Sequence, residues 1–248
     1  MDSWAALDAE LATWEAAGMR PRLWWRDDDA QRVTPDLERL LSLSQTHAVP
    51  VHLAVIPEGL GNDLAPRLRD TDYVYALQHG LRHRNNEPKG MPVSEVGDTR
   101  DIALQQADLK QGWDILQGAD LPRLLPGFVP PWNRIGDATR RHLPDWGYNF
   151  LSAYEGRADD DPVEGLTHID AHLDPIRWKY DRVFRGEEKM LAMLLDHLAD
   201  RRSGDPKRPI GYVTHHLQTP EAVWAFTDRL FAATRGLWAS VPQMQQEA

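Results

Sequence analysis

The sequence contains no cysteine, no long apolar run and an excess of acidic over basic side chains. Without cysteine there can be no disulfide and no thiolate ligand, so a metal ion must be held by His, Asp or Glu. The 28 Lys and Arg residues against 38 Asp and Glu residues give a formal net charge of −10. This charge argues against binding to nucleic acid or anionic membranes, since both need a basic surface.

No apolar run approaches the roughly 20 residues that span a bilayer. Residues 1–21 are acidic and lack the apolar centre of a signal peptide or membrane anchor. We therefore expect a protein of the cytoplasm.

What the sequence does contain is a regular rhythm of strand-like and helical runs. The strand-like runs mostly alternate with helical patterns, which indicates an α/β protein with a largely parallel sheet, either doubly wound or an incomplete barrel. The length of 248 residues, with 42% hydrophobic residues, suits a single domain. We expect a helix in residues 1–20 to pack on a barrel domain formed by residues 21–248. The seven strand-like runs are residues 22–25, 49–57, 73–79, 124–130, 148–154, 166–173 and 210–217.

Polar residues gather where several of these runs end. Because the C-terminal ends of parallel strands share one rim of the sheet, these side chains are expected to converge there. They are Asp27, Asp28, Asp29, His79, His83, the segment 130–134, Asp170, His172, Asp174, His215 and His216.

The chemistry of this set favours a divalent metal. One aspartate with His79 and His83 would supply three ligands suited to Zn²⁺ and leave a position open. A second aspartate beside it could accept a proton from water. Each part alone has a plainer interpretation: H-x-x-x-H is a weak motif, Gly80 rules out the metalloprotease form H-E-x-x-H, and an acidic triplet can cap a helix.

The order of these motifs resembles that of a known family. "WWRDDDA" (24–30), "LQHGLRH" (77–83), "VPPWNRI" (129–135) and a late strand-end histidine are similar to the polysaccharide deacetylases. These form carbohydrate esterase family four, the chitooligosaccharide deacetylase homology domain, and the likeness is to a bacterial polysaccharide-deacetylase-like subgroup. It spans about residues 22–220 and implies a deformed (β/α) barrel of about seven parallel strands.

The resemblance also implies roles for the acidic triplet. The family's first motif is Thr-Phe-Asp-Asp-Gly, in which the first aspartate is the general base and the second binds the metal. Aligning on Thr34, six residues after Asp28, makes Asp27 the base and Asp28 the ligand, and leaves Asp29 in the glycine position.

The second and third motifs depart from the family in two places. His79 and His83 match its paired ligands, but Gly80 replaces a hydroxyl residue and so removes one supporting hydrogen bond. Trp132 occupies the aromatic position whose backbone N–H serves the oxyanion hole. The arginine that orients the base is missing, and Arg26 or Arg134 could replace it.

The remaining motifs imply a general acid and a substrate-binding rim. Asp174 and Trp178 match the pair that lies near the acid. Strand alternation lets only one of His215 and His216 face the site, and the family's pattern favours His216. The predicted substrate contacts are Asn133, Arg134, Asp174 and Trp178, and Arg82 is a further candidate.

Together these features predict a metal-dependent hydrolase, most simply with Zn²⁺, that removes an N-acyl group such as acetyl from a sugar. Its partner would be a small-molecule or oligosaccharide substrate. Two alternatives stay open: another C–N hydrolase acting on small amides or ureides, and a non-catalytic carbohydrate- or metabolite-binding domain. The sequence predicts no oligomeric state.

Overall fold

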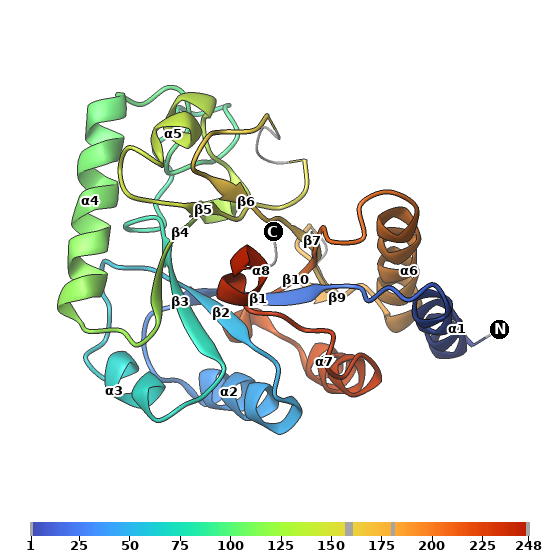
Figure 1. The fold of residues 1–248 in the computed structure, drawn as a ribbon. Coiled ribbons are helices and arrows are strands. Elements are labelled where there is room, and N and C mark those ends of the chain that lie inside the picture. Colours follow the sequence, from blue (N-terminus) through green and yellow to red (C-terminus); the bar gives the residue numbers. More distant parts are fainter. Residues whose placement is uncertain (1, 157–160, 180–181, 247–248) are drawn as a thin grey trace.

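The centre of the computed structural model is one curled sheet of eight parallel strands (Figure 1). The structure describes residues 2–156, 161–179 and 182–246. The strand order is β6-β5-β4-β3-β2-β1-β10-β7, which confirms the predicted α/β deformed barrel. These strands are β1 Leu23–Ala30, β2 Val51–Val55, β3 Val74–His79, β4 Leu124–Val129, β5 Phe150–Leu151, β6 Thr167–His168, β7 Ala171–Leu173 and β10 Ile210–Thr214.

The curl of the sheet follows from the run 166–173, which forms two strands where one was expected. β6 and β7 are the two edges of the sheet, yet only Ile169 and Asp170 separate them in sequence. The chain therefore crosses from one edge to the other within two residues. Trp24 of β1 donates a hydrogen bond from Nε1 to the Asp170 carbonyl oxygen at 3.1 Å, which ties this crossing to the middle of the sheet.

β1 divides its side chains between two environments. Trp25 points outward to the helices, where its ring lies 4.8 Å from that of Phe231. Trp24 points into the barrel and packs edge-on against Phe150 at 6.1 Å. Since side chains alternate along a strand, the acidic residues at the end of β1 are also divided between the inner and the outer face of the sheet.

Helices surround the sheet (Figure 1). Thr34 caps α2 by accepting the Leu37 N–H at 3.0 Å. Asp101 caps α4 by accepting the Ala103 N–H at 2.8 Å. The helices are α1 Ser3–Ala16, α2 Pro35–His47, α3 Leu64–Arg69, α4 Ile102–Gly118, α5 Asp137–His142, α6 Glu187–Ser203, α7 Glu221–Ala233 and α8 Val241–Gln246, with 3-10 turns η1 Pro131–Asn133 and η2 His216–Gln218.

Two elements have no counterpart in the sequence-based expectation. The hairpin of β8 (Ile176–Arg177) and β9 (Val183–Phe184) is antiparallel. Helix α8 covers the barrel at the N-terminal ends of the strands, where Val241 donates its N–H to His52 Nε2 at 3.0 Å. Both are too short to show a clear period in the sequence.

The N-terminal helix packs on the barrel's outer helices. Trp4 of α1 donates from Nε1 to Glu187 of α6 at 2.5 Å, and its ring lies 5.9 Å from Phe226 of α7. Glu10 accepts two hydrogen bonds from Arg202 of α6. These contacts agree with the expected packing of α1, and the division at residue 20 stays a prediction.

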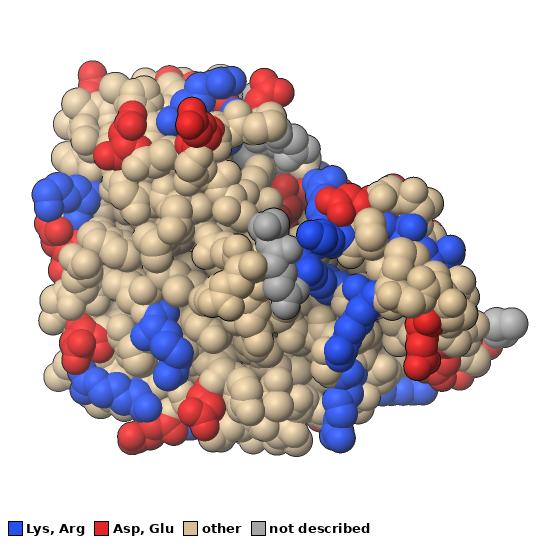
Figure 2. Space-filling model, viewed as in Figure 1, with Lys and Arg blue, Asp and Glu red and all other residues tan. Residues whose placement is uncertain are grey.

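Charged side chains of both signs are spread over the surface. In Figure 2 a band of basic side chains runs beside the lobe formed by α1 and α6, and acidic side chains are scattered around it. Of the helices in the described residues, none combines the length and apolar character needed to cross a membrane.

The crossing from β6 to β7 depends on the absence of a side chain at Gly211 of β10. A Cβ at this position would overlap the Asp170 carbonyl oxygen and Trp24 Nε1, both buried. We expect Gly211→Ala to lower the free energy of unfolding by about 1–3 kcal/mol, as overpacking does. Denaturant melts would measure the change. Gly118→Ala is the control: nothing lies within 4 Å of a Cβ there, and alanine favours the helix, so stability should be unchanged or slightly raised. Equal effects of the two substitutions would contradict this account of the crossing.

Candidate active site and metal centre

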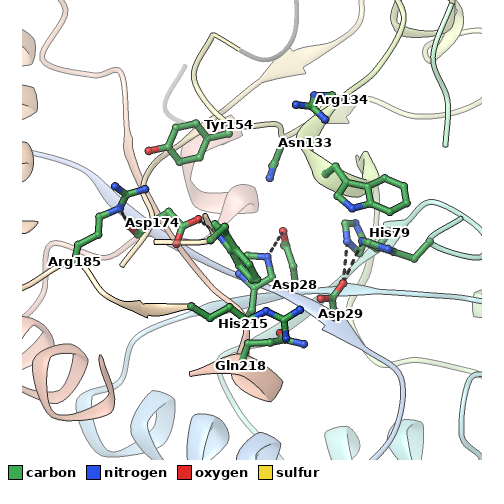
Figure 3. Close-up of a pocket in the computed structure, with 14 residues that line it drawn as sticks. Asp28, Asp29, His79, Asn133, Arg134, Tyr154, Asp174, Arg185, His215 and Gln218 are labelled. Carbon is green, nitrogen blue, oxygen red and sulfur yellow. Dashed lines mark hydrogen bonds and ion pairs between the residues drawn. The ribbon is translucent and has the colours of Figure 1, made fainter. Parts of the chain in front are cut away.

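A pocket of about 470 Å³ opens at the C-terminal ends of the strands. Figure 3 shows Asp29 and His79 on one side of it, Arg185 and Tyr154 on the other, and Asp28 and His215 between them. The pocket is of the size that holds a small ligand. Its lining residues are Asp28, Asp29, His79, His83, Trp132, Asn133, Arg134, Tyr154, Asp174, Trp178, Arg182, Arg185, His215 and Gln218.

Three of the lining side chains form a group that could hold a metal ion. Ligand atoms of Asp29, His79 and His83 all lie within 4.8 Å of one another. Asp29 Oδ1 is 3.4 Å from His79 Nε2 and 3.5 Å from His83 Nε2. His79 Nδ1 is 2.9 Å from the Val129 carbonyl oxygen. A carbonyl only accepts, so Nδ1 carries the proton and Nε2 keeps its lone pair for a ligand.

The separations between these atoms suit ligands that surround one small cation better than atoms that hydrogen-bond directly to one another. Ligands at 2.0–2.1 Å from a tetrahedral Zn²⁺ lie about 3.4 Å apart, which is close to the two separations above. Asp29 Oδ1 is buried, and among the described residues it makes no hydrogen bond. The residues present therefore fit a divalent ion held by one carboxylate and two imidazoles.

The charges of the group reinforce one another. Burial would raise the pKa of Asp29, but the contact with His79 and the nearby His215 and His83 lower it overall. Burial likewise opposes the charged form of His79, yet Asp29 and Asp28 raise its pKa. Protons therefore compete with a metal for His79, so metal affinity should weaken as the pH falls.

The residue beside the two histidines is Asp29, one position later than the alignment on Thr34 placed the ligand. Asp28 points instead to His215, with 3.7 Å between Asp28 Oδ2 and His215 Nε2. Asp29 has a positive φ of 73°, a conformation that aspartate tolerates better than most residues. This turn of the backbone swings the Asp29 side chain to the histidines, so in the candidate ligand set we replace Asp28 by Asp29.

Asp27, expected as the base, lies on the other face of β1. Its carboxylate accepts hydrogen bonds from the Thr214 hydroxyl at 2.6 Å and the His216 N–H at 3.0 Å. His216 Nδ1 contacts the same carboxylate at 2.5 Å, and both side chains are buried. Neither lines the pocket, whereas the neighbouring residues Asp28 and His215 do; the catalytic roles expected of Asp27 and His216 stay predictions. The alternation that put Trp25 outward puts Asp27 outward too.

Arg26 forms a buried ion pair with Asp28. Arg26 Nε is 2.8 Å from Asp28 Oδ1, and Nη2 donates to Asp28 Oδ2 at 3.0 Å. The other side of the guanidinium donates to the Ser152 carbonyl and hydroxyl oxygens. Of the two arginines considered as replacements for the family's missing one, Arg26 is in contact with the candidate base, whereas Arg134 lines the pocket.

Glu95 takes over the support that Gly80 was expected to lose. Its buried carboxylate accepts the backbone N–H groups of Arg82 at 2.9 Å, His83 at 3.1 Å and Leu81 at 3.4 Å. Gly80 has a φ of 60°, and a Cβ there would overlap Glu95 Oε2. The glycine thus makes room for a carboxylate that holds the turn carrying His83. The sequence gives no sign of this partner 12 residues away in a polar loop.

Two tryptophans form walls on either side of the candidate catalytic groups. The Trp132 ring lies 4.3 Å from that of His83, and the Trp178 ring 4.6 Å from that of His215. Asp174 accepts the Trp178 Nε1–H at 2.6 Å, and burial raises the pKa of its carboxyl group. Asp174 and Trp178 therefore lie beside His215, as the resemblance implied.

The turn after β4 brings further predicted residues into the pocket. Trp132 and Asn133 have positive φ angles of 56° and 57°, which are costly for such residues and typical of functional sites. Asn133 Oδ1 accepts a hydrogen bond from Arg26 Nη2 at 2.5 Å. Arg134 lines the same wall, whereas Arg82 turns away to Glu58 at 2.9 Å.

Four pocket residues were not singled out from the sequence. Tyr154, Arg182, Arg185 and Gln218 lie after β5, at β9 and in η2. None belongs to a motif, and Arg182 and Arg185 reach the pocket through the unexpected β8–β9 hairpin.

No protein-family model matches the chain, and no curated protein matches it in sequence. Solved structures do share its architecture. The chain has the fold of the polysaccharide deacetylases. A family 4 carbohydrate esterase from Streptomyces lividans in complex with acetate matches with a TM-score of 0.55 and 12% identity, over 88% of this chain and 90% of that one.

Two other similar structures carry different activities on this fold. A family 4 acetyl xylan esterase from Clostridium thermocellum, in complex with a cobalt ion, has a TM-score of 0.56 and 10% identity, over 91% of this chain and 90% of that one. An allantoinase, Puue, has a TM-score of 0.60 and 16% identity, over 85% of this chain and 71% of that one. At these identities the likeness establishes the fold.

A series of matched substitutions tests the order of the triplet. We expect Asp29→Asn to weaken Zn²⁺ binding by more than about 100-fold, because it removes the anionic ligand. Asp28→Asn should retain the metal. Asp27→Asn should also retain it while lowering the free energy of unfolding by about 1–3 kcal/mol, since buried donors lose their acceptor. Competition with a chelating dye would measure the affinities. Loss of metal from the Asp28 variant but not the Asp29 variant would restore the original alignment.

The turn held by Glu95 provides a second test. Glu95→Ala leaves buried N–H groups without an acceptor, so we expect the free energy of unfolding to fall by about 1–3 kcal/mol. Metal affinity should fall about 10–100-fold, because the turn carries His83. The control is Glu58→Ala, which removes a half-exposed carboxylate whose partner among the described residues is the Arg82 side chain. If both variants bound metal like the parent protein, Glu95 would have no role in the ligand set.

Proposed function

We propose that the protein is a divalent-metal-dependent hydrolase, most simply a zinc enzyme, that removes an acetyl group from the nitrogen of a sugar. The observation that carries this proposal is the pairing of two sites in one pocket: a candidate ligand group of Asp29, His79 and His83, and a carboxylate, Asp28, that lies between Arg26 and His215. The first can hold a metal and the second can move a proton.

A divalent ion bound by these three residues would polarise the acyl carbonyl group and increase the acidity of water. Asp28 is the general base in this proposal and accepts the proton of the attacking water. Arg26 keeps the Asp28 carboxylate oriented by two contacts, at 2.8 and 3.0 Å. Because Arg26 is fully buried, it can orient the base without contacting the substrate.

His215 is the general acid on the opposite side of Asp28. It donates a proton to the leaving nitrogen, and the buried Asp174 lies close to it on the same side of the pocket. The Trp178 ring against His215 limits the motion of the imidazole. In this proposal the backbone N–H of Trp132, which lines the pocket, stabilises the developing oxyanion.

The solved structures support this class of chemistry without identifying the substrate. The S. lividans esterase is in complex with acetate and the C. thermocellum enzyme with a cobalt ion. Puue is an allantoinase, which keeps hydrolysis of a small C–N substrate as the second candidate. A location in the cytoplasm stays a prediction.

The proposal is tested by measuring acetate release from N-acetylated sugars by the zinc-loaded protein, with allantoin as the alternative substrate. We expect Asp28→Asn and His215→Ala each to lower kcat by about 10²–10⁴-fold while metal remains bound. The matched control is His216→Ala, which changes the neighbouring histidine on the outer face of the sheet. This substitution should affect stability more than kcat. Acetate release that survives Asp28→Asn unchanged would remove it as the base, and turnover of allantoin alone would favour the second candidate.

A further inference from the structure

Three arginines line the pocket, Arg134, Arg182 and Arg185, although the chain as a whole carries a net charge of −10. Arg182 and Arg185 flank β9 of the β8–β9 hairpin, and we call this pair the arginine wall. Figure 3 shows Arg185 across the pocket from Asp29 and His79, whereas Arg134 lies beside Asn133. The arginine wall therefore lies away from the candidate metal ligands, where the part of a substrate remote from its acyl group would bind.

Among the described residues, the two arginines of this wall form no direct ion pair. Arg185 donates from Nε to the Asp174 carbonyl oxygen at 2.7 Å, and its charge opposes the rise in the pKa of the Asp174 carboxyl group that burial causes. The Asp174 carboxylate itself is occupied by the N–H groups of Ile176 at 2.8 Å and Trp178 at 2.6 Å. Within the residues that the structure describes, neither Arg182 nor Arg185 forms an ion pair. Arg82, outside the pocket, shows the usual alternative with its two carboxylates, Glu58 and Asp108.

With a metal ion bound, positive charge would exceed negative charge among the described residues of the pocket. Its lining has three aspartates, Asp28, Asp29 and Asp174, against the three arginines. Asp28 is paired with buried Arg26, and Asp29 belongs to the candidate metal group, where an ion would add two positive charges. The arginine wall therefore faces a pocket with a positive balance inside an acidic protein, an arrangement that attracts an anion.

We propose that Arg182 and Arg185, together with Arg134, bind an anionic group of the substrate, a carboxylate or a phosphate. This inference rests on the proposed function and specifies its substrate class: an N-acylated sugar that carries an acid group. A guanidinium group matches both anions because its N–H donors can form two parallel hydrogen bonds to their oxygens. The tethered acid would hold the sugar with its acyl group toward Asp29 and His79.

The proposal predicts where the arginines act. They take no part in proton transfer in the proposed reaction, so their loss should raise KM for acidic substrates and leave kcat nearly unchanged. A neutral substrate should be insensitive to them. A purely structural role would instead affect neutral and acidic substrates alike.

Binding to the metal-free protein isolates the arginine wall, since a metal could bind phosphate by itself. Calorimetry would compare three probes on the chelator-treated protein: N-acetylglucosamine, N-acetylglucosamine 6-phosphate and N-acetylmuramic acid. The first is neutral, the second carries a phosphate and the third a carboxylate. We expect at least one acidic probe to bind about tenfold or more tightly than the neutral one, with the difference shrinking as salt rises. The more tightly bound acid identifies which source of negative charge the wall accepts.

Substitutions assign the effect to the wall. Arg185→Gln and Arg182→Gln should each reduce the preference for the acidic probe, and the double variant should abolish it. Lys189→Gln, an exposed residue of α6 outside the pocket, removes the same charge and should leave the preference intact. Equal binding of neutral and acidic probes, no binding of either acid, or equal loss in the Lys189 variant would each overturn the proposal.

Failure of the substrate class is distinguishable from failure of the proposed function. Acetate release from the neutral sugar, with no tighter binding of the acidic probes, would contradict only the inference about the arginines. A retained preference for an acidic probe, with no acetate release from any sugar by the zinc-loaded protein, would support the anion site and remove the hydrolase.

Discussion

The buried contact between Arg26 and Asp28 connects the fold to its candidate chemistry. One guanidinium group inside the barrel contacts Asp28 of its own strand, Ser152 and Ala153 after β5, and Asn133 in η1. Breaking a buried ion pair by removing one partner costs about 3–5 kcal/mol, because a charge is left uncompensated. The same contact therefore stabilises the barrel interior and sets the direction of the candidate base, so that stability and function are linked through one side chain.

Three consecutive aspartates are tolerable because the backbone sends them to three different places. Asp27 points outward to Thr214 and His216, and Asp28 points inward to Arg26. Asp29 escapes the alternation through its positive φ and reaches the histidines. Each carboxylate thus has its own source of positive charge or hydrogen-bond donors, and the repulsion that the sequence suggests is largely removed.

The sequence alone predicted the fold and the gathering of the site residues at one rim of the sheet. It did not predict which residue of each adjacent pair faces the pocket. Period-two and helical patterns mark the main elements, and the parallel topology brings their C-terminal ends together. Alternation also showed that adjacent acids or histidines cannot share a face, yet it could not tell which member of each pair faces inward. Counting back from Thr34 placed the metal ligand at Asp28, whereas Asp29 is the carboxylate beside the two histidines. The family's pattern favoured His216, whereas His215 is the histidine that lines the pocket. Both choices depend on the packing of Trp24 and Trp25 against opposite sides of the sheet, which is a tertiary property.

Other parts of the site left no local signal. Glu95 supports His83 from a polar loop in which any acidic residue would look solvated, and only the fold shows that it accepts three backbone N–H groups. Arg185 lies after a strand of two residues, too short for any periodic pattern. The roles of these residues depend on long-range contacts. Sequence motifs therefore reveal the candidate catalytic residues, but not the residues that hold them in place or bind the substrate.

The two sides of the pocket are built from different kinds of structure, and this difference separates chemistry from selectivity. Asp28 and Asp29 lie on β1 and His79 lies on β3, both in the central part of the sheet, so the candidate catalytic groups share the rigidity of the sheet. Arg182 and Arg185 lie at the short β8–β9 hairpin outside it. Loops and hairpins at the rim of a rigid scaffold can change without disturbing the sheet. An arginine wall on the hairpin can therefore alter which substrate is held, while the strand ends keep the groups that would act on it.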